Sequence, residues 1–245
     1  MASLTRIHHA SPDLSGRSTE SEWLDDASMD HAELERVLRD LARFNGTMLG
    51  RRVVISWLRR AIDGAPHGET LTLVDVGCGY GDLLRAIRRW SRRRNLELNL
   101  VGADLNPETI RIARAATDAA DRIDFRVMNI FELDSIEPVD FIVSSLVAHH
   151  LSDSDIAEFL RLMERTARRG WAICDLQRHR FLYHFIGLTG SLARLHPMVV
   201  RDGQISVTRS LTRREWQERI AEAGILPADV TIRWFLFRFL IGRLR

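Results

Sequence analysis

The segment Leu71–Leu84, LTLVDVGCGYGDLL, decides the fold of this chain. The apolar run at its start predicts a buried strand, and Gly77, Gly79 and Gly81 follow on alternate positions. Glycine lets the backbone turn tightly and lets a ligand approach where a Cβ would stand in its way. An amphipathic helix begins directly after the glycines, and its N-terminus offers free N–H groups and a partial positive charge. Together these parts predict a cradle for a ligand.

The glycine spacing separates this segment from two common nucleotide-binding motifs. In the dinucleotide fingerprint GxGxxG the third glycine would fall on Asp82, and a P-loop needs a lysine, which this chain lacks altogether. The stretch VDVGCGYG instead resembles motif I of the class I S-adenosylmethionine-dependent methyltransferases, and the resemblance extends over roughly Leu71–Leu176. A tight strand–helix turn in another doubly wound domain is the structural alternative.

Apolar runs alternate with amphipathic stretches through the rest of the chain. This alternation predicts an α/β fold with a Rossmann-like doubly wound sheet of about seven strands, mostly parallel, in which the last strand is antiparallel. The resemblance implies that the last two strands form a hairpin. After the first strand, the expected strands are 98–103, 125–128, 140–144, 171–175, 230–234 and 237–241.

Residues 1–69 are expected to form an N-terminal tail and a helical cap, ahead of an S-adenosylmethionine-binding domain over 70–245. For residues 1–28, disorder and an ordered arm over the active site are both open. Asp30 and Glu33 predict a capping box at the start of a first helix, and Asn45-Gly46 predicts the break before a second one.

An aromatic stretch over residues 176–210 interrupts the alternation after the fifth expected strand. It contains Phe181, Tyr183, His184 and Phe185. We expect it to form a lid-like insert that walls a pocket, although these residues could also serve only to bury the insert against the domain.

The resemblance places the cofactor contacts at the carboxyl ends of the strands, where open α/β sheets bind their ligands. The glycine turn would face the methionine part of the cofactor, and Asp75 would orient that turn or meet the cofactor amine through water. Asp104 would accept hydrogen bonds from the ribose hydroxyls, unless it is merely a helix-capping group. Asn129 stands where related methyltransferases commonly carry an aspartate against the adenine amino group. The full set of expected cofactor contacts is Asp75, Gly77, Cys78, Gly79, Gly81, Asp104, Leu105, Asn129, Ile130 and Ser145.

The segment SSLVAHHLSD, residues 144–153, is expected where the acceptor meets the cofactor sulfonium. Its AHHLSD part is similar to the HDWSD piece of plant-type small-molecule O-methyltransferases, whose catalytic histidine falls on His149. His150 stands where that piece has an aspartate. Many other class I methyltransferases carry a single histidine before the leucine, which would make His150 a pocket or structural residue. For both residues, a histidine packed at a helix start is the alternative.

These features predict an enzyme that methylates a small aromatic, phenolic or polyketide-like acceptor in secondary metabolism, with oxygen as the favoured target. A phenol is mostly protonated at neutral pH, so a histidine is a suitable general base. C-methylation of the same substrate class is an alternative, and so is a non-catalytic cofactor-binding protein with a regulatory or assembly role. We expect substrate contacts from Asn45, His150, Tyr183 and His184, and no metal.

The composition of the chain limits its partners. With 245 residues, 45% of them hydrophobic, and a net charge of +2, it can bury one sizeable core and carries no large electrostatic field. The arginines within residues 88–94 are expected on a solvated helix face rather than on nucleic acid. Cys78 and Cys174, in predicted buried positions, fit a reducing cytoplasm. No apolar run predicts a transmembrane segment, but the aromatics and arginines of 234–245 leave a peripheral membrane contact open beside two closing strands.

Overall fold

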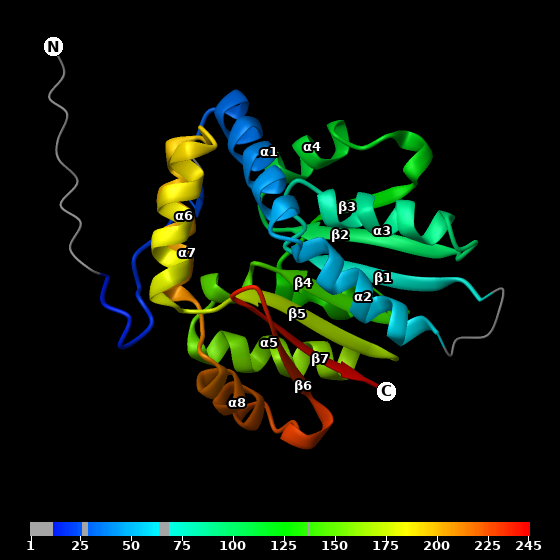
Figure 1. Ribbon diagram of the computed structural model, residues 1–245. Helices are drawn as coiled ribbons and strands as arrows, with labels where there is room; N and C mark the ends of the chain where they lie inside the picture. Colours follow the sequence, from blue (N-terminus) through cyan, green and yellow to red (C-terminus); the bar gives the residue numbers. More distant parts are fainter. Residues whose placement is uncertain (1–11, 26–28, 64–68, 137) are drawn as a thin grey trace, which may run out of the picture.

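The computed structural model describes residues 12–25, 29–63, 69–136 and 138–245. Its strands are β1 (Leu71–Val76), β2 (Leu98–Asp104), β3 (Ile123–Val127), β4 (Phe141–Ser145), β5 (Gly170–Leu176), β6 (Thr231–Phe235) and β7 (Arg238–Leu244). They form one sheet in the order β3-β2-β1-β4-β5-β7-β6 (Figure 1). The first five strands are parallel, and β7 is antiparallel to both β5 and β6. The predicted fold class is therefore confirmed.

Helices cover both faces of this sheet. They are α1 (His31–Thr47), α2 (Gly50–Ile62), α3 (Asp82–Arg92), α4 (Pro107–Ala115), α5 (Asp153–Thr166), α6 (Arg180–Leu192), α7 (Pro197–Arg209) and α8 (Arg213–Glu222), with short 3-10 turns η1 (Trp23–Asp25), η2 (Ala119–Asp121), η3 (Ile130–Ser135), η4 (Ala148–His150) and η5 (Pro227–Asp229).

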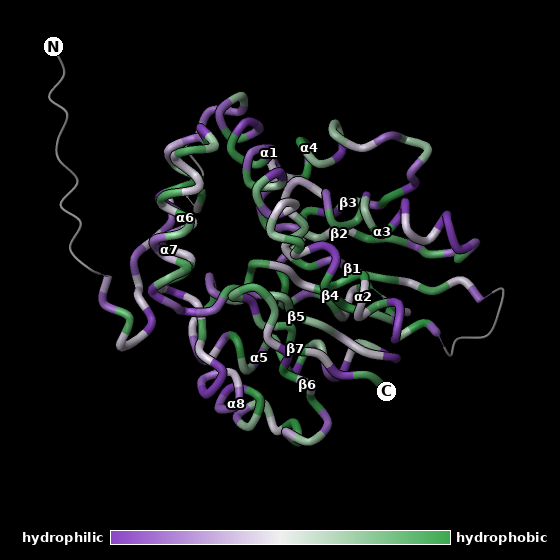
Figure 2. The backbone as a smooth tube through the Cα atoms, in the orientation of Figure 1, coloured by the Kyte–Doolittle hydropathy of each residue, from purple (hydrophilic) through white to green (hydrophobic). Residues whose placement is uncertain are grey.

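Alternate residues of each central strand point to opposite faces, and both faces are buried. On β1, Leu71 and Leu73 pack with α2, α3 and α4, whereas Val74 and Val76 pack with α5 and α8. The middle of the sheet is accordingly hydrophobic in Figure 2. Burial on two faces explains why these strands read as continuous apolar runs in the sequence.

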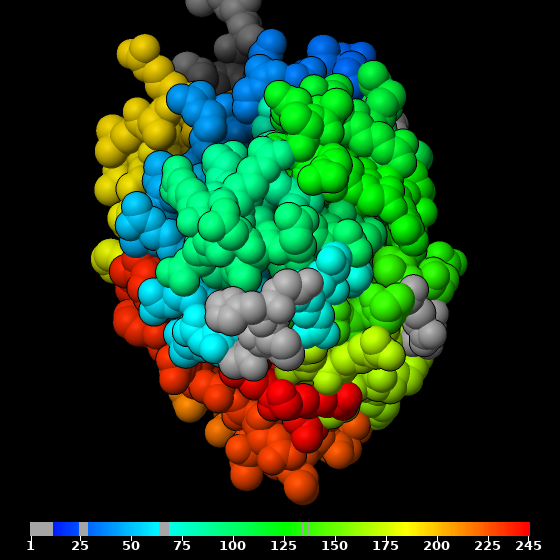
Figure 3. Space-filling model, turned by 90° about the vertical axis from the view of Figure 1, so that its right-hand side faces the viewer, coloured from blue at the N-terminus to red at the C-terminus, as the bar shows by residue number. Residues whose placement is uncertain are grey.

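Three helices stand beyond the carboxyl ends of the parallel strands: α1, α6 and α7 (Figure 1). The aromatic insert over 176–210 is thus a helical pair, in which His179 and His196 cap α6 and α7. At the opposite end of the molecule, Figure 3 shows the end of α3 and the last residues of the chain. The cap and the insert are therefore placed to enclose whatever binds at the strand ends.

Two local predictions for the cap are wrong. Helix α1 runs through Asn45 and Gly46, and the chain breaks only at Leu49, which has a left-handed φ of 59°. Asn45 stays helical while its side chain accepts a hydrogen bond from Arg238, a residue of β7. At the other end of α1, Asp30 accepts the Ala32 N–H without the expected capping box, because Glu33 turns toward His196, 3.7 Å away.

The predictions for the N-terminal tail and for the arginines of residues 88–94 are confirmed only in part. Residues 12–25 form the ordered arm, whereas the rest of the expected tail, 1–11 and 26–28, lies outside the described residues. Arg88 is buried, and its guanidinium donates to the carbonyls of Asp121 and Arg122. The other arginines of this stretch, Arg89, Arg92, Arg93 and Arg94, are exposed as expected. Among the described residues, no helix is long and apolar enough to cross a membrane.

Candidate active site

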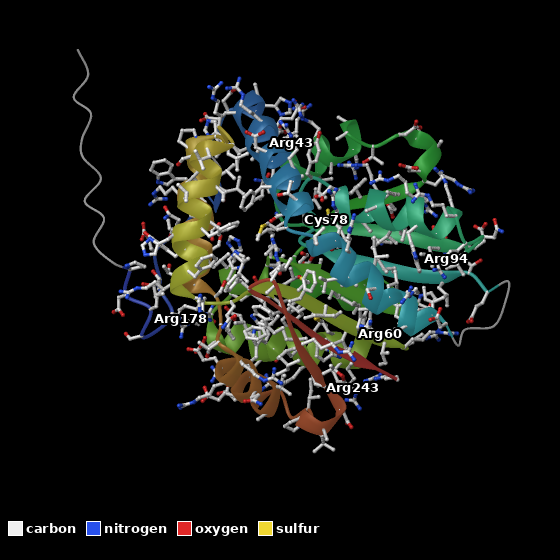
Figure 4. All side chains as sticks on the ribbon, in the orientation of Figure 1. Arg43, Arg60, Cys78, Arg94, Arg178 and Arg243 are labelled. Atoms are coloured by element: carbon white, nitrogen blue, oxygen red, sulfur yellow. The ribbon has the colours of Figure 1, made fainter. Side chains whose placement is uncertain are left out.

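A cavity of about 890 Å³ opens at the carboxyl ends of β1, β2 and β4, under α1, α6 and α7. It brings together most of the residues predicted from the sequence. Those that line it are Asn45, Asp75, Gly77, Cys78, Gly79, Asp104, Leu105, Asn129, Ile130, Ser145, His149 and His150. Figure 4 labels Cys78 near the middle of the molecule and Arg94 at the far end of α3, so the exposed α3 arginines lie away from this cavity.

The glycine turn forms one wall of the cavity. Gly77, Gly79 and Gly81 all have left-handed φ values, of 69°, 50° and 73°. A Cβ on Gly79 would have no protein atom within 4 Å, so this position leaves open space beside the backbone. Gly81, a predicted cofactor contact, is not part of the lining. It caps α3, and a Cβ there would lie 2.8 Å from the Phe125 ring, so it serves packing.

Asp104 ends β2 with both carboxylate oxygens directed to backbone N–H groups. One oxygen accepts from Gly79 at 3.0 Å and the other from Asn106 at 3.1 Å. Burial raises the pKa of this carboxyl group, and the two backbone hydrogen bonds oppose that shift. The capping alternative for Asp104 is wrong, because the Asn106 side chain caps α4. Each Asp104 oxygen retains acceptor capacity toward the cavity.

Asp75 is a buried carboxyl group, and its Oδ1 has no hydrogen-bond partner among the described residues. Burial raises its pKa well above the ordinary value, with Asp82 and Asp104 adding to the effect. A cationic N–H donor in the cavity would give Asp75 Oδ1 a partner and would lower the raised pKa, because it favours the charged carboxylate. Asn129, by contrast, already uses its side-chain oxygen to accept the Phe131 N–H at the start of η3.

His149 lies on η4 and is held by Asp175 of β5 at two points. Its backbone N–H donates to Asp175 Oδ2 at 3.0 Å, and its Nδ1 lies 2.7 Å from Asp175 Oδ1. Burial would raise the pKa of Asp175, but the His149 ring and the N–H groups of His149 and Leu176 together lower it. Asp175 is thus an ionised acceptor, and His149 Nδ1 donates to it.

The ordered arm brings a second carboxylate, Glu22, to the other side of the histidines. Glu22 is buried, its Oε1 lies 3.6 Å from His149 Nε2, and its Oε2 lies 3.7 Å from His150 Nε2. Ser206 of α7 donates to Glu22 Oε1 at 2.9 Å. Ligand atoms of Glu22, His149 and His150 all lie within 4.8 Å of one another, so this group could also hold a metal ion.

Two arginines fasten the arm over η4. Arg17 donates to the carbonyls of His149 and Leu151, and its own Nε donates to the Arg209 carbonyl. Arg209 in turn donates to the carbonyls of His149 and His150. The carbonyl of His149 is therefore bound by both arginines, and that of His150 by Arg209.

Tyr183 and His184 of α6 are not part of the lining, although both were predicted substrate contacts. The α6 side chains that reach the cavity are Leu182 and Ile186, four residues apart on one helix face. His184 is exposed, and Tyr183 packs edge-on against it at 5.3 Å between ring centroids. Helical rotation turns these two residues away from the site.

Comparison with known proteins identifies the domain. Residues 73–170 match the family model described as a methyltransferase domain. The structure of the plantazolicin methyltransferase BpumL with bound SAH superimposes with a TM-score of 0.59 at 16% identity, over 88% of this chain and 98% of that one. The chain therefore carries a methyltransferase domain over residues 73–170, on the fold of class I S-adenosylmethionine-dependent methyltransferases.

Two further proteins show how far the similarity of this methyltransferase extends. A ubiquinone biosynthesis O-methyltransferase of Methylobacterium sp. (strain 4-46) is 29% identical over 167 residues, which are 66% of this chain. The chain spans 62% of the length of that relative. Magnesium protoporphyrin IX methyltransferase from Synechocystis PCC 6803 with bound SAH has a TM-score of 0.54 and 14% identity, over 82% of this chain and 83% of the other.

The cavity has groups that would suit S-adenosylmethionine, whose product SAH is bound in the solved methyltransferases of this fold. The cavity lining includes Gly79 with open space beside it, the Asp75 oxygen that lacks a partner among the described residues, and Asp104 with its spare acceptor capacity. A cofactor with an ammonium group and two ribose hydroxyls would meet these groups. When bound, it supplies an electrophilic methyl group on a positively charged sulfur.

Sequence reasoning missed three residues of the site: Glu22, Asp175 and Arg238. Asp175 lies at the end of β5 and Arg238 at the start of β7, at the same edge of the sheet. The strand pattern predicts these positions, but it does not show that Asp175 contacts His149 or that Arg238 contacts Asn45. Glu22 reaches the methyltransferase site only through the path of the arm, which no local pattern in residues 12–25 indicates.

Proposed function

We propose that this methyltransferase transfers the methyl group of S-adenosylmethionine to a hydroxyl oxygen of a small aromatic acceptor, with His149 as the general base. One observation carries the proposal: His149 lines the cavity while Asp175 holds its Nδ1 at 2.7 Å. That bond fixes the tautomer, because Nδ1 carries the proton and Nε2 keeps the lone pair. Nε2 is then the ring atom that can accept a proton from an acceptor hydroxyl.

The reaction is an in-line displacement at the methyl carbon. His149 Nε2 would accept the hydroxyl proton as the acceptor oxygen bonds to the methyl group that bound S-adenosylmethionine would supply, and the electron pair of the broken carbon–sulfur bond would stay on sulfur. Alignment of the two reactants lowers the barrier most. A general base adds about 10²–10⁴-fold, because a phenol with a pKa near 10 is mostly protonated at neutral pH.

Two carboxylates support the charge that His149 acquires. Asp175 faces Nδ1 and orients the ring, as a buried carboxylate does in a catalytic triad. Glu22 lies 3.6 Å from Nε2, so it adds negative potential on the side where the proton arrives. Both carboxylates are buried, which strengthens their interaction with an imidazolium.

The walls around the acceptor region support an aromatic or polyketide-like molecule. The apolar side chains that line this part of the cavity come from α1, α6 and α7 and include Leu38, Leu41, Phe44, Leu182, Ile186 and Val199. The similarity to the Methylobacterium O-methyltransferase of ubiquinone biosynthesis also supports oxygen as the target. The plantazolicin and magnesium protoporphyrin IX enzymes share the fold with quite different acceptors.

A panel experiment tests the proposal. The protein is incubated with S-adenosylmethionine carrying a deuterated methyl group and with phenols, catechols and alkylresorcinols, and mass spectrometry locates the label. We expect the label on oxygen of at least one acceptor class. A label on ring carbon would show that the enzyme is a C-methyltransferase instead. Cofactor binding without methyl transfer to any member of the panel would favour a regulatory or assembly role.

A further inference from the structure

We propose that Arg238 binds a carboxylate of the acceptor, so that the preferred substrates of this methyltransferase are hydroxylated aromatic acids. The inference deepens the proposed function and rests on it. It starts from a buried cation that lines the same cavity and has no anionic partner in the described part of the chain.

Arg238 is only 2% exposed and forms part of the cavity wall. It is the first residue of β7 and is paired with Leu176, the last residue of β5. Its Nη2 donates to the Asn45 side-chain oxygen at 3.0 Å, whereas Nε and Nη1 have no hydrogen-bond partner among the described residues. Gly50 leaves room for the guanidinium, because a Cβ there would lie 3.1 Å from Nη1. The three N–H groups on Nε and Nη1 of this buried guanidinium therefore have no acceptor among the described residues.

Among the described residues, two neighbours of the Arg238 guanidinium, Asn45 and Cys174, supply no negative charge. Asn45 is neutral. Burial raises the pKa of the Cys174 thiol to about 11, although Arg238 opposes the shift, so Cys174 is also neutral at pH 7. Arg178, which is buried too, is different: it donates to two carbonyls and pairs with Glu215 at 2.6 Å. A buried charge without a counter-ion is costly, so a partner from the ligand would be strongly favoured.

The place of Arg238 in the sheet assigns it to the acceptor rather than to the cofactor. Three strand spacings separate β7 from β1, which puts the Arg238 backbone about 14 Å from the glycine turn. The adenosine groups are expected toward β2 and β3, on the other side of β1. Arg238 instead adjoins β5, where Leu176 directly follows the Asp175 that holds His149. A carboxylate on Arg238 therefore anchors an acceptor beside the proposed base.

A pair of probes that differ only in charge tests this site. Binding of 3,4-dihydroxybenzoate and of 3,4-dihydroxybenzamide is measured by calorimetry, with and without saturating S-adenosylhomocysteine. We expect the acid to bind about 10- to 100-fold more tightly than the amide, since a hydrogen-bonded charge pair is formed only with the acid. The preference should survive saturation with S-adenosylhomocysteine.

Arg238→Met, which keeps the length of the side chain and removes its charge, should reduce acid binding to the level of the amide. Because replacing a buried unpaired cation by an apolar side chain is often neutral or stabilising, the variant should keep its melting temperature and its affinity for S-adenosylhomocysteine. Arg43→Met, at an exposed arginine of α1, is the matched control and should keep the preference.

Equal binding of acid and amide by the wild-type protein would overturn the proposal. So would loss of the acid preference when S-adenosylhomocysteine is added, because the anion on Arg238 would then be the cofactor carboxylate. If Arg238→Met fails to fold, Arg238→Lys decides the question, since it should keep a weakened preference for the acid. Tight acid binding without any methyl transfer would refute the proposed function and leave the anion site intact.

Discussion

His149 and Asp175 are joined at two points, from the Nδ1 and the backbone N–H of one residue to the two carboxylate oxygens of the other, at 2.7 and 3.0 Å. The first bond fixes the tautomer of the ring, and the second fixes the loop that carries it. Neither residue can shift without breaking both contacts. The pair therefore presents Nε2 at a constant position, which is what a general base requires.

Replacing Asp175 by asparagine should lower kcat by about 10²–10⁴-fold, because an amide neither stabilises the imidazolium nor enforces the tautomer. The dissociation constant for S-adenosylmethionine should change only a few-fold, since Asp175 is not among the cofactor-facing groups. Single-turnover kinetics and equilibrium binding measure the two quantities separately. A parallel loss of cofactor binding would show that the residue is needed for the fold of the site instead.

Asp104→Ala should weaken cofactor binding by about 10- to 100-fold, because the expected hydrogen bonds from the ribose hydroxyls to a carboxylate are lost. Asp124→Ala is the control, since Asp124 is an exposed residue of the neighbouring strand β3 that pairs with Arg126. Calorimetry with S-adenosylhomocysteine gives both affinities. Similar losses in the two variants would remove Asp104 from the ribose contact.

Cofactor affinity should rise with pH through the raised pKa of Asp75. Burial holds that carboxyl group in its neutral form to higher pH than usual, and a cofactor ammonium beside it would favour the charged form. Binding must then release a proton below the raised pKa. Calorimetry in buffers of different ionisation enthalpy detects this release, and Asp75→Asn should abolish it. Proton uptake by the wild-type protein, or release that persists in the variant, would contradict the placement of the ammonium group.

A chelator should leave turnover unchanged, although Glu22, His149 and His150 offer ligand atoms within 4.8 Å of one another. The proposed base needs the lone pair of His149 Nε2, and a metal ion would occupy it. Rates before and after treatment with EDTA, and after addition of Zn²⁺, measure the effect. If EDTA abolished activity and Zn²⁺ restored it, these residues would form a metal centre and His149 would not be the general base.

The sequence predicts the strands, turns and helix starts around the glycine turn well, because their signals are local. The apolar run before Gly77, the spacing of the glycines and the cap at Asn106 each lie within one strand–turn–helix unit, and the structure places them as expected. Gly81 is the exception. Its left-handed φ was predictable, but the Phe125 ring behind it comes from a distant strand.

The acceptor side depends on contacts that no local pattern contains. Glu22 reaches His149 because the arm is bound to η4 through Arg17 and to α7 through contacts such as the Ser206–Glu22 hydrogen bond. Tyr183 and His184 looked suitable by residue type, yet the rotation of α6 presents Leu182 and Ile186 to the cavity instead. Which side chains face the cavity depends on how whole helices and strands pack, and the sequence does not show this packing directly.

The most direct test of the central claim is the single-turnover rate of His149→Ala at saturating S-adenosylmethionine, with a phenolic acceptor from the panel. We expect the rate of methyl transfer to fall by about 10²–10⁴-fold, with cofactor affinity nearly unchanged. A rate equal to that of the wild-type protein would contradict the claim that His149 removes the acceptor proton.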